Sequence, residues 1–282
     1  MPVNLRKLLI GTIRNIIDLL GAVNSARAKR VISDALGFDY VTTEVVNTKY
    51  GLISYFCTNN LTRWRVETFF SKEPETLEWI DSFADGDVLW DVGANIGLYT
   101  IYAGKMGVNV VAFEPGGANY YLLNKNIHLN KLDYEVDAFC IALADDTCAG
   151  HLMLSDMNTG TACNSFNEES KVNGVSLPII MRQGSIGYSI DDFLDRFKVP
   201  FPNHLKIDVD GIEGKIVFGA EKTLNDKKLR SISIELDSKD ANNTQQIIQK
   251  IMSYGFVLTS RRHAAMFEEG EFTSLYNYRF DR

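Results

Sequence analysis

The sequence has few cysteines and no long hydrophobic run. Its four cysteines, Cys57, Cys140, Cys148 and Cys163, show no C-x-x-C spacing, so they predict reduced, structural thiols in a cytoplasmic protein and not a zinc site or a disulfide framework. Polar residues interrupt the apolar start at Leu8-Leu9-Ile10, too early for a signal peptide or a membrane-spanning helix. Repeats, low-complexity runs and linkers rich in Pro, Gly or Ser are absent too, which argues against cleanly separate domains.

Positive charge is also scarce. The formal net charge is −7 and the sequence pI is about 5.2, and no basic stripe interrupts this acidic balance, so a nucleic-acid partner is not expected. The two basic clusters, at residues 27–30 and 261–263, are short and typical of solvated surface. The 282 residues, 45% hydrophobic and 23% charged, are ordinary for a globular protein with a sizeable core.

The chain does contain a nucleotide-binding half-unit between residues 88 and 115. The apolar run Val88–Trp90 predicts a buried strand, a helix is expected over residues 98–106, and residues 110–113 predict a second buried strand. Gly93 and Gly97 bracket a tight loop before the helix. Because glycine permits positive φ and close approach to the main chain, the segment GANIG predicts a concave ligand-binding surface. A tight turn without a ligand is the alternative interpretation.

Two acidic residues indicate which ligand this half-unit would bind. Glu114 ends the second strand, 21 residues after Gly93, where a carboxylate can accept both ribose hydroxyls of an adenosine. The turn lacks the central glycine of the dinucleotide pattern G-x-G-x-x-G. Asp91, two residues before the first glycine, would oppose a pyrophosphate but suits a ligand bearing an ammonium and a sulfonium. The sequence therefore favours S-adenosylmethionine.

The N-terminal part predicts a cap on the rest of the chain. Apolar residues at helical spacing predict an amphipathic helix over residues 4–21, which would pack on the domain, on a second subunit of a homo-oligomer, or on a membrane surface. A hairpin is expected from strands 40–46 and 50–57, followed by helices 62–70 and 74–83. We therefore divide the chain into a helix and hairpin cap, residues 1–84, and a Rossmann-like domain, residues 85–282.

Helix and strand continue to alternate after residue 115. The patterns predict helices at 118–129, from 189, at 215–224 and 245–252, and strands at 135–141, 150–154, 205–209, 231–236, 256–259 and 275–280. The polar segment 158–174 is expected to be a lid or an exposed surface connection. The aromatic residues Tyr276, Tyr278 and Phe280 share one face of the last strand and are expected in the core.

Acidic residues cluster at the end of the strand 205–209. Asp208, Asp210 and Glu213 lie within six residues, and in an open parallel sheet the ligand crevice lies at the carboxyl ends of the strands. These carboxylates should therefore face the same crevice as Gly93 and Glu114. The helix dipole explains Glu213 better than function does, and Glu235, set between apolar neighbours, would need a partner when buried.

Taken together, five segments resemble the FkbM-type methyltransferases. They are Asp91-Val92-Gly93-Ala94-Asn95-Ile96-Gly97, Ala112-Phe113-Glu114-Pro115, Ala142-Leu143-Ala144-Asp145, Ile190-Asp191-Asp192-Phe193 and Leu205-Lys206-Ile207-Asp208-Val209-Asp210-Gly211-Ile212-Glu213. The resemblance implies an α/β, Rossmann-like class I methyltransferase with a mostly parallel seven-stranded sheet carrying one antiparallel strand. It departs from the family at Asp210, where Glu is usual.

The resemblance also implies a function. An S-adenosylmethionine-dependent O-methyltransferase is expected, acting on a hydroxyl of a sugar, glycan or related small molecule. Its implied cofactor-binding residues share the crevice: Asp91, Gly93, Ala94, Asn95 and Gly97 at the methionine end, Glu114 at the ribose and Ala142 at the adenine. An NAD-dependent oxidoreductase and a non-catalytic cofactor-binding module are the alternatives.

Methyl transfer to a hydroxyl requires positioning and a base. Asp208 and Asp210 are the candidate catalytic residues, with His151 and His204 as alternatives. A carboxylate is a weak base for an alcohol unless desolvation raises its pKa or a divalent metal acidifies the acceptor, and the sequence leaves both routes open. No metal-ligand motif accompanies these carboxylates.

Overall fold

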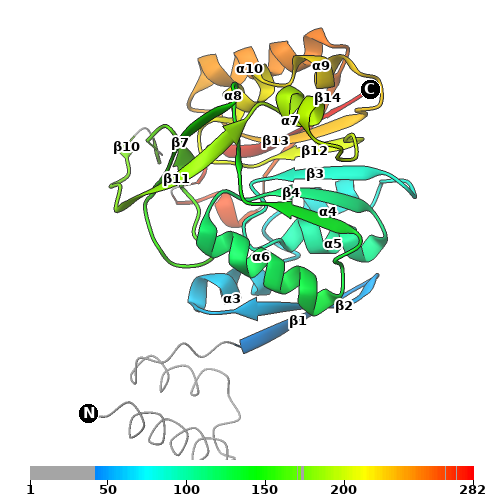
Figure 1. The fold of residues 1–282 in the computed structure, drawn as a ribbon, viewed down its shortest axis with the longest axis vertical. Coiled ribbons are helices and arrows are strands. Elements are labelled where there is room, and N and C mark those ends of the chain that lie inside the picture. The colour runs from blue at the N-terminus through cyan, green and yellow to red at the C-terminus, as the bar shows by residue number, and fades with distance from the viewer. Residues whose placement is uncertain (1–41, 170, 173–174, 264, 271) are drawn as a thin grey trace, which may run out of the picture.

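A computed structural model describes residues 42–169, 171–172, 175–263, 265–270 and 272–282. The predicted amphipathic helix at residues 4–21 lies outside the described residues. Figure 1 shows a central sheet between two layers of helices, with a hairpin below the second layer. None of the described helices is both long enough and apolar enough to cross a membrane.

The central sheet has seven strands in the order β14-β15-β13-β12-β3-β4-β5. Their bounds are β3 Val88–Val92, β4 Asn109–Phe113, β5 Val136–Phe139, β12 His204–Ile207, β13 Ser231–Asp237, β14 Val257–Arg262 and β15 Leu275–Asp281. Only β15 pairs antiparallel, with both of its neighbours, while the other pairs are parallel. The predicted sheet with one antiparallel strand is confirmed.

Two layers of helices cover the two faces of this sheet (Figure 1). One layer contains α7 Ile190–Arg196, α8 Glu213–Phe218, α9 Glu221–Asn225 and α10 Ala241–Ser253. The other contains α4 Pro74–Ile80, α5 Leu98–Met106 and α6 Gly117–Asn130. The segment 215–224, predicted as one helix, is interrupted at Gly219. A Cβ there would lie 2.4 Å from the carbonyl oxygen of Ala144, so the chain approaches a neighbouring loop too closely for a larger residue.

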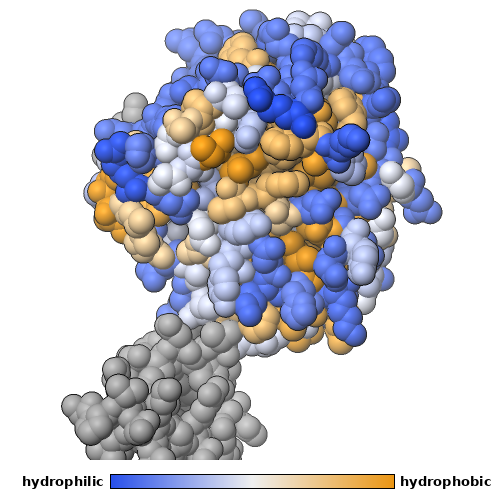
Figure 2. All heavy atoms as spheres, viewed as in Figure 1, coloured by the Kyte–Doolittle hydropathy of each residue, from blue (hydrophilic) through white to orange (hydrophobic). Residues whose placement is uncertain are grey.

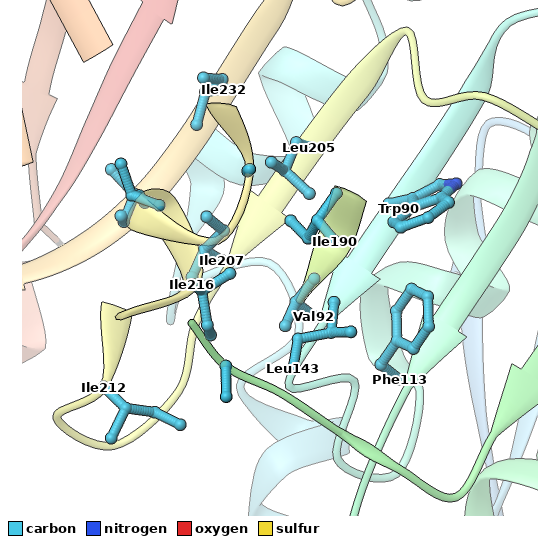
Figure 3. Packing of buried hydrophobic residues seen from close by; sticks show 14 of the residues in the cluster. Trp90, Val92, Phe113, Leu143, Ile190, Leu205, Ile207, Ile212, Ile216 and Ile232 are labelled. Carbon is cyan, nitrogen blue, oxygen red and sulfur yellow. The ribbon is translucent and has the colours of Figure 1, made fainter. Parts of the chain in front are cut away.

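The first layer packs on an apolar face of the sheet. Trp90 and Phe113 lie in this core with ring centroids 5.0 Å apart, and Figure 3 shows Ile207 and Ile232 in the same cluster. Tyr278 and Phe280 are also buried in it, as their shared strand face predicted. The indole Nε1 of Trp90 donates to the carbonyl of Pro200 at 2.9 Å, so its one polar atom is also satisfied.

The opposite face is polar at the middle of the sheet. Side chains alternate along a strand, so Trp90 points into the apolar core while Asp91 points to the other side. Lys206 lies between Leu205 and Ile207, which belong to the apolar cluster, and its register partner on β3 is Asp91. Two ionisable residues therefore meet beneath α4 and α5, inside a sheet whose central strands are buried.

The hairpin β1 Thr42–Thr48 and β2 Gly51–Cys57 packs on α6 through apolar contacts and two side chains. Asn126 accepts the backbone N–H of Phe56 at 2.8 Å, and Asn130 accepts that of Ser54 at 3.0 Å. Ile53 and Tyr55 are fully buried in the same core as the α4–α6 layer. Hairpin and sheet thus share one core, and the division of the chain at residues 84 and 85 stays a prediction.

A second sheet, β6-β11-β7-β8, projects from the first. Its strands are β6 Ala142–Leu143, β7 Cys148–Leu154, β8 Ser165–Phe166 and β11 Met181–Tyr188, beside a small pair of β9 Lys171–Val172 and β10 Val175–Ser176. The prediction missed β11, since its two glycines and its polar residues Arg182, Gln183 and Ser185 leave no apolar alternation in the sequence. Figure 2 shows apolar side chains at its outer end, where Ile179, Ile180 and Met181 are exposed.

Candidate active site

The turn between β3 and α5 is closed by its own hydrogen bonds. The amides of Gly93 and Ala94 donate to the carbonyl of Phe113, and that of Gly97 donates to Ala94. The Asn95 amide donates to Glu114 Oε2 at 2.8 Å, and the Ile96 amide to the Asn95 side chain. All five amides from residue 93 to residue 97 thus have acceptors inside the protein. The turn itself therefore offers no free N–H group to a pyrophosphate.

The two glycines of the turn are required by contacts within the protein. Gly93 has φ +87°, and a Cβ there would lie 1.9 Å from the carbonyl oxygen of Asp208. Gly97 has φ +88°, and its Cβ would lie 2.5 Å from Leu123 Cδ1. From the sequence, both glycines were predicted to let a ligand approach the main chain closely. The structure shows that they also let the turn approach the end of β12 and the side of α6.

Glu114 lies where the sequence placed it, at the end of β4 and beside the turn. Its two carboxylate oxygens accept the amides of Asn95 and Gly116, each at 2.8 Å. Burial raises the pKa of Glu114 to about 7, because the charged form loses its hydration. The side chain of Asn119 also bonds this carboxylate. Because the two oxygens of a carboxylate accept about four hydrogen bonds in total, capacity remains for a hydroxyl donor.

Asp91 is buried with one oxygen unused. Oδ2 accepts the hydroxyl of Thr100 at 2.5 Å, while Oδ1 is buried and has no hydrogen-bond partner. Burial raises the pKa of this carboxyl, which the nearby Lys206 opposes. Burying a carboxylate oxygen without a donor raises the free energy of the folded state. A ligand with a cationic or hydrogen-bond donor group could satisfy this atom.

Lys206 is the centre of a buried charge cluster that the sequence analysis missed. It is 2% exposed, its Nζ lies 2.5 Å from Asp208 Oδ2, and it lies over the ring of Tyr99. Burial by itself lowers the pKa of Lys206. The carboxylates of Asp208, Glu73 and Asp91 outweigh this effect, so the pKa is raised. The available signal was a lysine in the middle of a buried strand, between Leu205 and Ile207.

Glu73 and Lys72 bring the segment before α4 to the same cluster. Their side chains lie 2.5 Å apart, and Glu73 is 2% exposed. Burial raises the pKa of Glu73, but the ammonium groups of Lys72 and Lys206 outweigh it and lower that pKa. This acidic residue next to Pro74 gave no sequence signal of its own, because its partners lie on distant segments.

Asp208 and Asp210 follow β12 and have different surroundings. Asp208 Oδ2 is occupied by Lys206, whereas Asp210 Oδ2 accepts the amide of Asn164 at 3.0 Å. Burial raises the pKa of Asp210 to about 6, although the amides of Asn164 and Cys163 lower it. A pKa of about 6 suits a general base at neutral pH, and among the described residues no ammonium group is bonded to Asp210 as Lys206 is to Asp208.

The loop that supplies these amides docks over the turn. The Thr161 carbonyl accepts the side-chain amides of Asn95 at 2.9 Å and Asn119 at 3.0 Å. Arg65, on α3 Asn60–Glu67, donates to the Gly160 carbonyl at 2.6 Å. The first half of the segment 158–174 therefore covers the crevice and is not a mere surface connection. Whether it opens and closes as a lid stays a prediction.

Ala142 and the two histidines lie elsewhere. Ala142 pairs with Gly187 in the second sheet, and its side chain is buried in the apolar core. His204 begins β12, at the edge of the sheet opposite to the carboxylates, and its ring nitrogens contact Asp87 and Ser231. His151, on β7, contacts Arg182. The geometry gives neither histidine a contact with Asp208 or Asp210.

A cleft of about 1000 Å³ opens beside Asp210. Its walls come from the ends of β12 and β13, the first turns of α8 and α10, and the residues before β15. Among the described residues, no group of three or more His, Cys, Asp or Glu side chains converges closely enough to hold a metal ion. A sugar-sized ligand fits a cleft of this volume.

Fold and site together define a class I methyltransferase. Residues 91–258, more than half of the chain, match the methyltransferase FkbM domain, and the chain belongs to the FkbM methyltransferase family. This agrees with the five segments that carried the resemblance. The matched residues include Asp91, Asp210 and most of the residues that line the cleft.

Two characterised relatives share about a quarter of their aligned residues with this chain. The chain is 25% identical over 179 residues to the hexuronic acid methyltransferase AglP of Haloferax volcanii, covering 63% of this chain and 69% of that protein. It is 24% identical over 204 residues to the 31-O-demethyl-FK506 methyltransferase FkbM of Streptomyces tacrolimicus, covering 63% of this chain and 75% of that one. Among solved structures, a methyltransferase FkbM from Methylobacillus flagellatus KT superposes with a TM-score of 0.51 at 14% identity, over 79% of this chain and 52% of that chain.

Proposed function

We propose that this protein is an S-adenosylmethionine-dependent O-methyltransferase that acts on a hydroxyl of a sugar, glycan or related small molecule. The observation that carries the proposal is the turn beside Glu114, in which every amide already has an acceptor within the protein. The turn itself leaves no free N–H group for a pyrophosphate, whereas the carboxylate of Glu114 can accept the hydroxyls of an adenosine. This favours S-adenosylmethionine over NAD.

The residues at this edge of the sheet fit the cofactor. Glu114 keeps acceptor capacity for the ribose hydroxyls, and the unpartnered Oδ1 of Asp91 suits the ammonium of the methionine end. Gly93, Ala94, Asn95 and Gly97 form the turn between them. By family resemblance the segment from Ala142 would bound the adenine, although the side chain of Ala142 itself is buried.

Asp210 is the general base of the proposed reaction. When bound, S-adenosylmethionine supplies an electrophilic methyl group, which passes to the acceptor oxygen as the carbon–sulfur bond breaks. Asp210 accepts the hydroxyl proton as the oxygen attacks, and burial has brought its pKa to about 6. Asp208, bonded to Lys206, orients the segment that carries Asp210. Burial and positioning support Asp210 as the base, without need of a metal to acidify the acceptor.

Substrate support comes from two relatives. The name of the Haloferax volcanii protein assigns it a hexuronic acid, and that of the Streptomyces tacrolimicus protein assigns it a demethylated FK506. Both names give an oxygen-rich small molecule as the acceptor, which supports methyl transfer to a small molecule of this kind. We propose the same class of acceptor here, and no nucleic acid, because the chain is acidic.

The proposal is tested by methyl transfer itself. Purified protein is incubated with methyl-labelled S-adenosylmethionine and a panel of glycosides and glycans, and products are analysed by mass spectrometry. We expect the label on an acceptor oxygen, and none with the Asp210→Asn variant. Tight cofactor binding with no transfer to any acceptor would instead support a non-catalytic module.

A further inference from the structure

We infer that the cleft beside Asp210 is the acceptor site and that it selects sugars without a carboxylate, favouring those that carry a protonated amine. This inference rests on the proposed function, and it goes further by naming the charge of the acceptor. It is carried by the position of the cleft, the aromatic rings on its wall and the charges that line it.

The cleft lies next to the proposed general base. Asp210 lines it, and so does Glu235 from the end of the adjacent strand β13. The carboxyl ends of parallel strands are where ligands bind in such sheets. An acceptor in this cleft would therefore have a hydroxyl next to the proposed base.

Two aromatic rings make part of the wall apolar. Phe218 at the end of α8 and Phe272 before β15 both line the cleft, and they are 45% and 38% exposed. Single exposed apolar side chains are ordinary on a surface, but here two phenylalanine rings lie on the wall of one cleft, and apolar side chains in a polar-rimmed groove are typical of a ligand-binding site. The apolar face of a sugar ring stacks on aromatic rings while its hydroxyls reach nearby carboxylates, so this combination suits a sugar.

The charges on the wall are predominantly negative. Seven carboxylates line the cleft, against two lysines. One lysine, Lys215, has its ammonium 2.5 Å from Glu168, so the positive charge on that wall is already compensated. Burial raises the pKa of Glu213 to about 8 and raises that of Glu235, but the carboxylates at the rim, such as Glu169 and Asp240, leave the cleft acidic.

This charge distribution discriminates between otherwise similar sugars. A uronate in the cleft would place a further negative charge among these carboxylates. Among the described residues that line the cleft, only two lysines and no arginine could offset that charge. A neutral sugar incurs no such repulsion, and an amino sugar is attracted. Like charges placed together suppress a wrong partner more strongly than attraction selects the right one.

A matched trio of glycosides tests the inference. Methyl glucopyranoside, methyl 2-amino-2-deoxyglucopyranoside and methyl glucopyranosiduronate differ mainly in charge. Their binding to the full chain saturated with S-adenosylhomocysteine is measured by titration, together with methyl transfer. We expect affinity in the order amino, neutral, uronate, with about tenfold between the first and the last at low salt.

Charge reversal at the rim provides the matched variant. Glu169→Lys changes an exposed lining residue that lies outside the proposed catalytic groups, and we expect it to reduce the amino-to-uronate ratio at least about fivefold. Glu67→Lys makes the same change in charge on α3, away from the cleft lining, and should leave the ratio unaltered. Affinity for S-adenosylhomocysteine should be the same in both variants.

The outcomes separate this inference from the proposed function. A wild-type preference for the uronate, or a ratio that responds equally to both variants, would overturn the inference while the cofactor binding stands. Failure of all three glycosides to bind the S-adenosylhomocysteine-loaded protein would overturn the cleft as a sugar site. Failure to bind S-adenosylhomocysteine would remove the proposed function, and the inference with it.

Discussion

At the scale of single residues, Asp210 carries the proposed proton transfer. Replacing it by Asn keeps an acceptor for the amide of Asn164 but removes the base, so we expect kcat to fall by about 10²- to 10⁴-fold with unchanged affinity for S-adenosylhomocysteine. In the wild type, kcat should rise as pH increases through about 6, the pKa to which burial raises Asp210. Initial rates from pH 5 to 8 measure both effects. A flat profile, or full activity of the variant, would rule out this role.

Glu213 makes stability depend on pH. Burial raises its pKa to about 8 from the usual 4.5, so the folded state holds a proton that the unfolded state releases. This contribution is fully present below pH 4.5 and is lost as pH rises toward 8. Glu213→Gln keeps an oxygen for the amide of Gly211 and cannot ionise. We expect its Tm to exceed that of the wild type at pH 8 by about a few degrees and to match it near pH 4. The reverse order at pH 8 would contradict this.

At the scale of elements, a chain of hydrogen bonds fastens α4 to the sheet. Trp79 Nε1 donates to Ser231 Oγ at 2.8 Å, and Ser231 lies 2.7 Å from His204 Nδ1. His204 Nε2 is 2.9 Å from Asp87. Burial lowers the pKa of His204 to about 4, so the ring is neutral and can accept at Nδ1 while it donates to Asp87. Ser231 is buried at the edge opposite to the cleft, which makes this chain structural.

This chain of hydrogen bonds predicts a coupling between Trp79 and Ser231. Trp79→Phe removes the donor and should destabilise the fold by about 1–2 kcal/mol, as should Ser231→Ala. Because both changes break one hydrogen bond, the double variant should lose about 1 kcal/mol less than the sum of the two. Urea unfolding of the four proteins measures this. Strict additivity would show that the bond contributes nothing.

Lys206 links three elements through its carboxylate neighbours. Lys206→Met leaves Asp208, Asp91 and Glu73 without this ammonium, and breaking a buried pair in this way typically costs about 3–5 kcal/mol. We expect a loss of that size in urea unfolding. Lys125→Met, which removes an exposed lysine on α6, is the control and should change stability by less than about 0.5 kcal/mol. Equal stability of the two variants would contradict the assigned role of the cluster.

The sequence predicted elements well where a local pattern specified them. The buried strands predicted at residues 88–90 and 205–209 correspond to β3 and β12, although β12 ends at Ile207, and the glycines marked the turn after β3. The prediction failed where contacts between distant segments determine the secondary structure. β11 has no apolar alternation of its own, and Gly219 interrupts a helical pattern only because Ala144 lies against it.

The site was predictable to the same extent. The carboxylates at strand ends could be placed in one crevice, because parallel topology brings strand ends together. The Lys206 cluster could not, since Glu73 and Lys72 reach it from a separate segment. The docking of Thr161 on Asn95 and Asn119 was equally hidden, because an irregular loop carries no periodic signal.

At the scale of the whole molecule, the chain combines a class I methyltransferase sheet with a hairpin that shares its core. Segments from both parts approach the crevice: Arg65 holds the loop over the turn, and Glu73 enters the charge cluster. The segment from Arg65 to Glu73 thus contributes to the candidate site. The cytoplasmic location and a homo-oligomer formed through residues 4–21 stay predictions.

The central claim is that the edge formed by the turn and Glu114 binds S-adenosylmethionine. Calorimetric titration with S-adenosylhomocysteine and with NAD, on the wild type and on Glu114→Gln, tests it most directly. We expect micromolar binding of S-adenosylhomocysteine only, weakened at least about tenfold in the variant, where an amide replaces the acceptor of the ribose hydroxyls. Binding of NAD, or equal S-adenosylhomocysteine affinity in both proteins, would contradict the account.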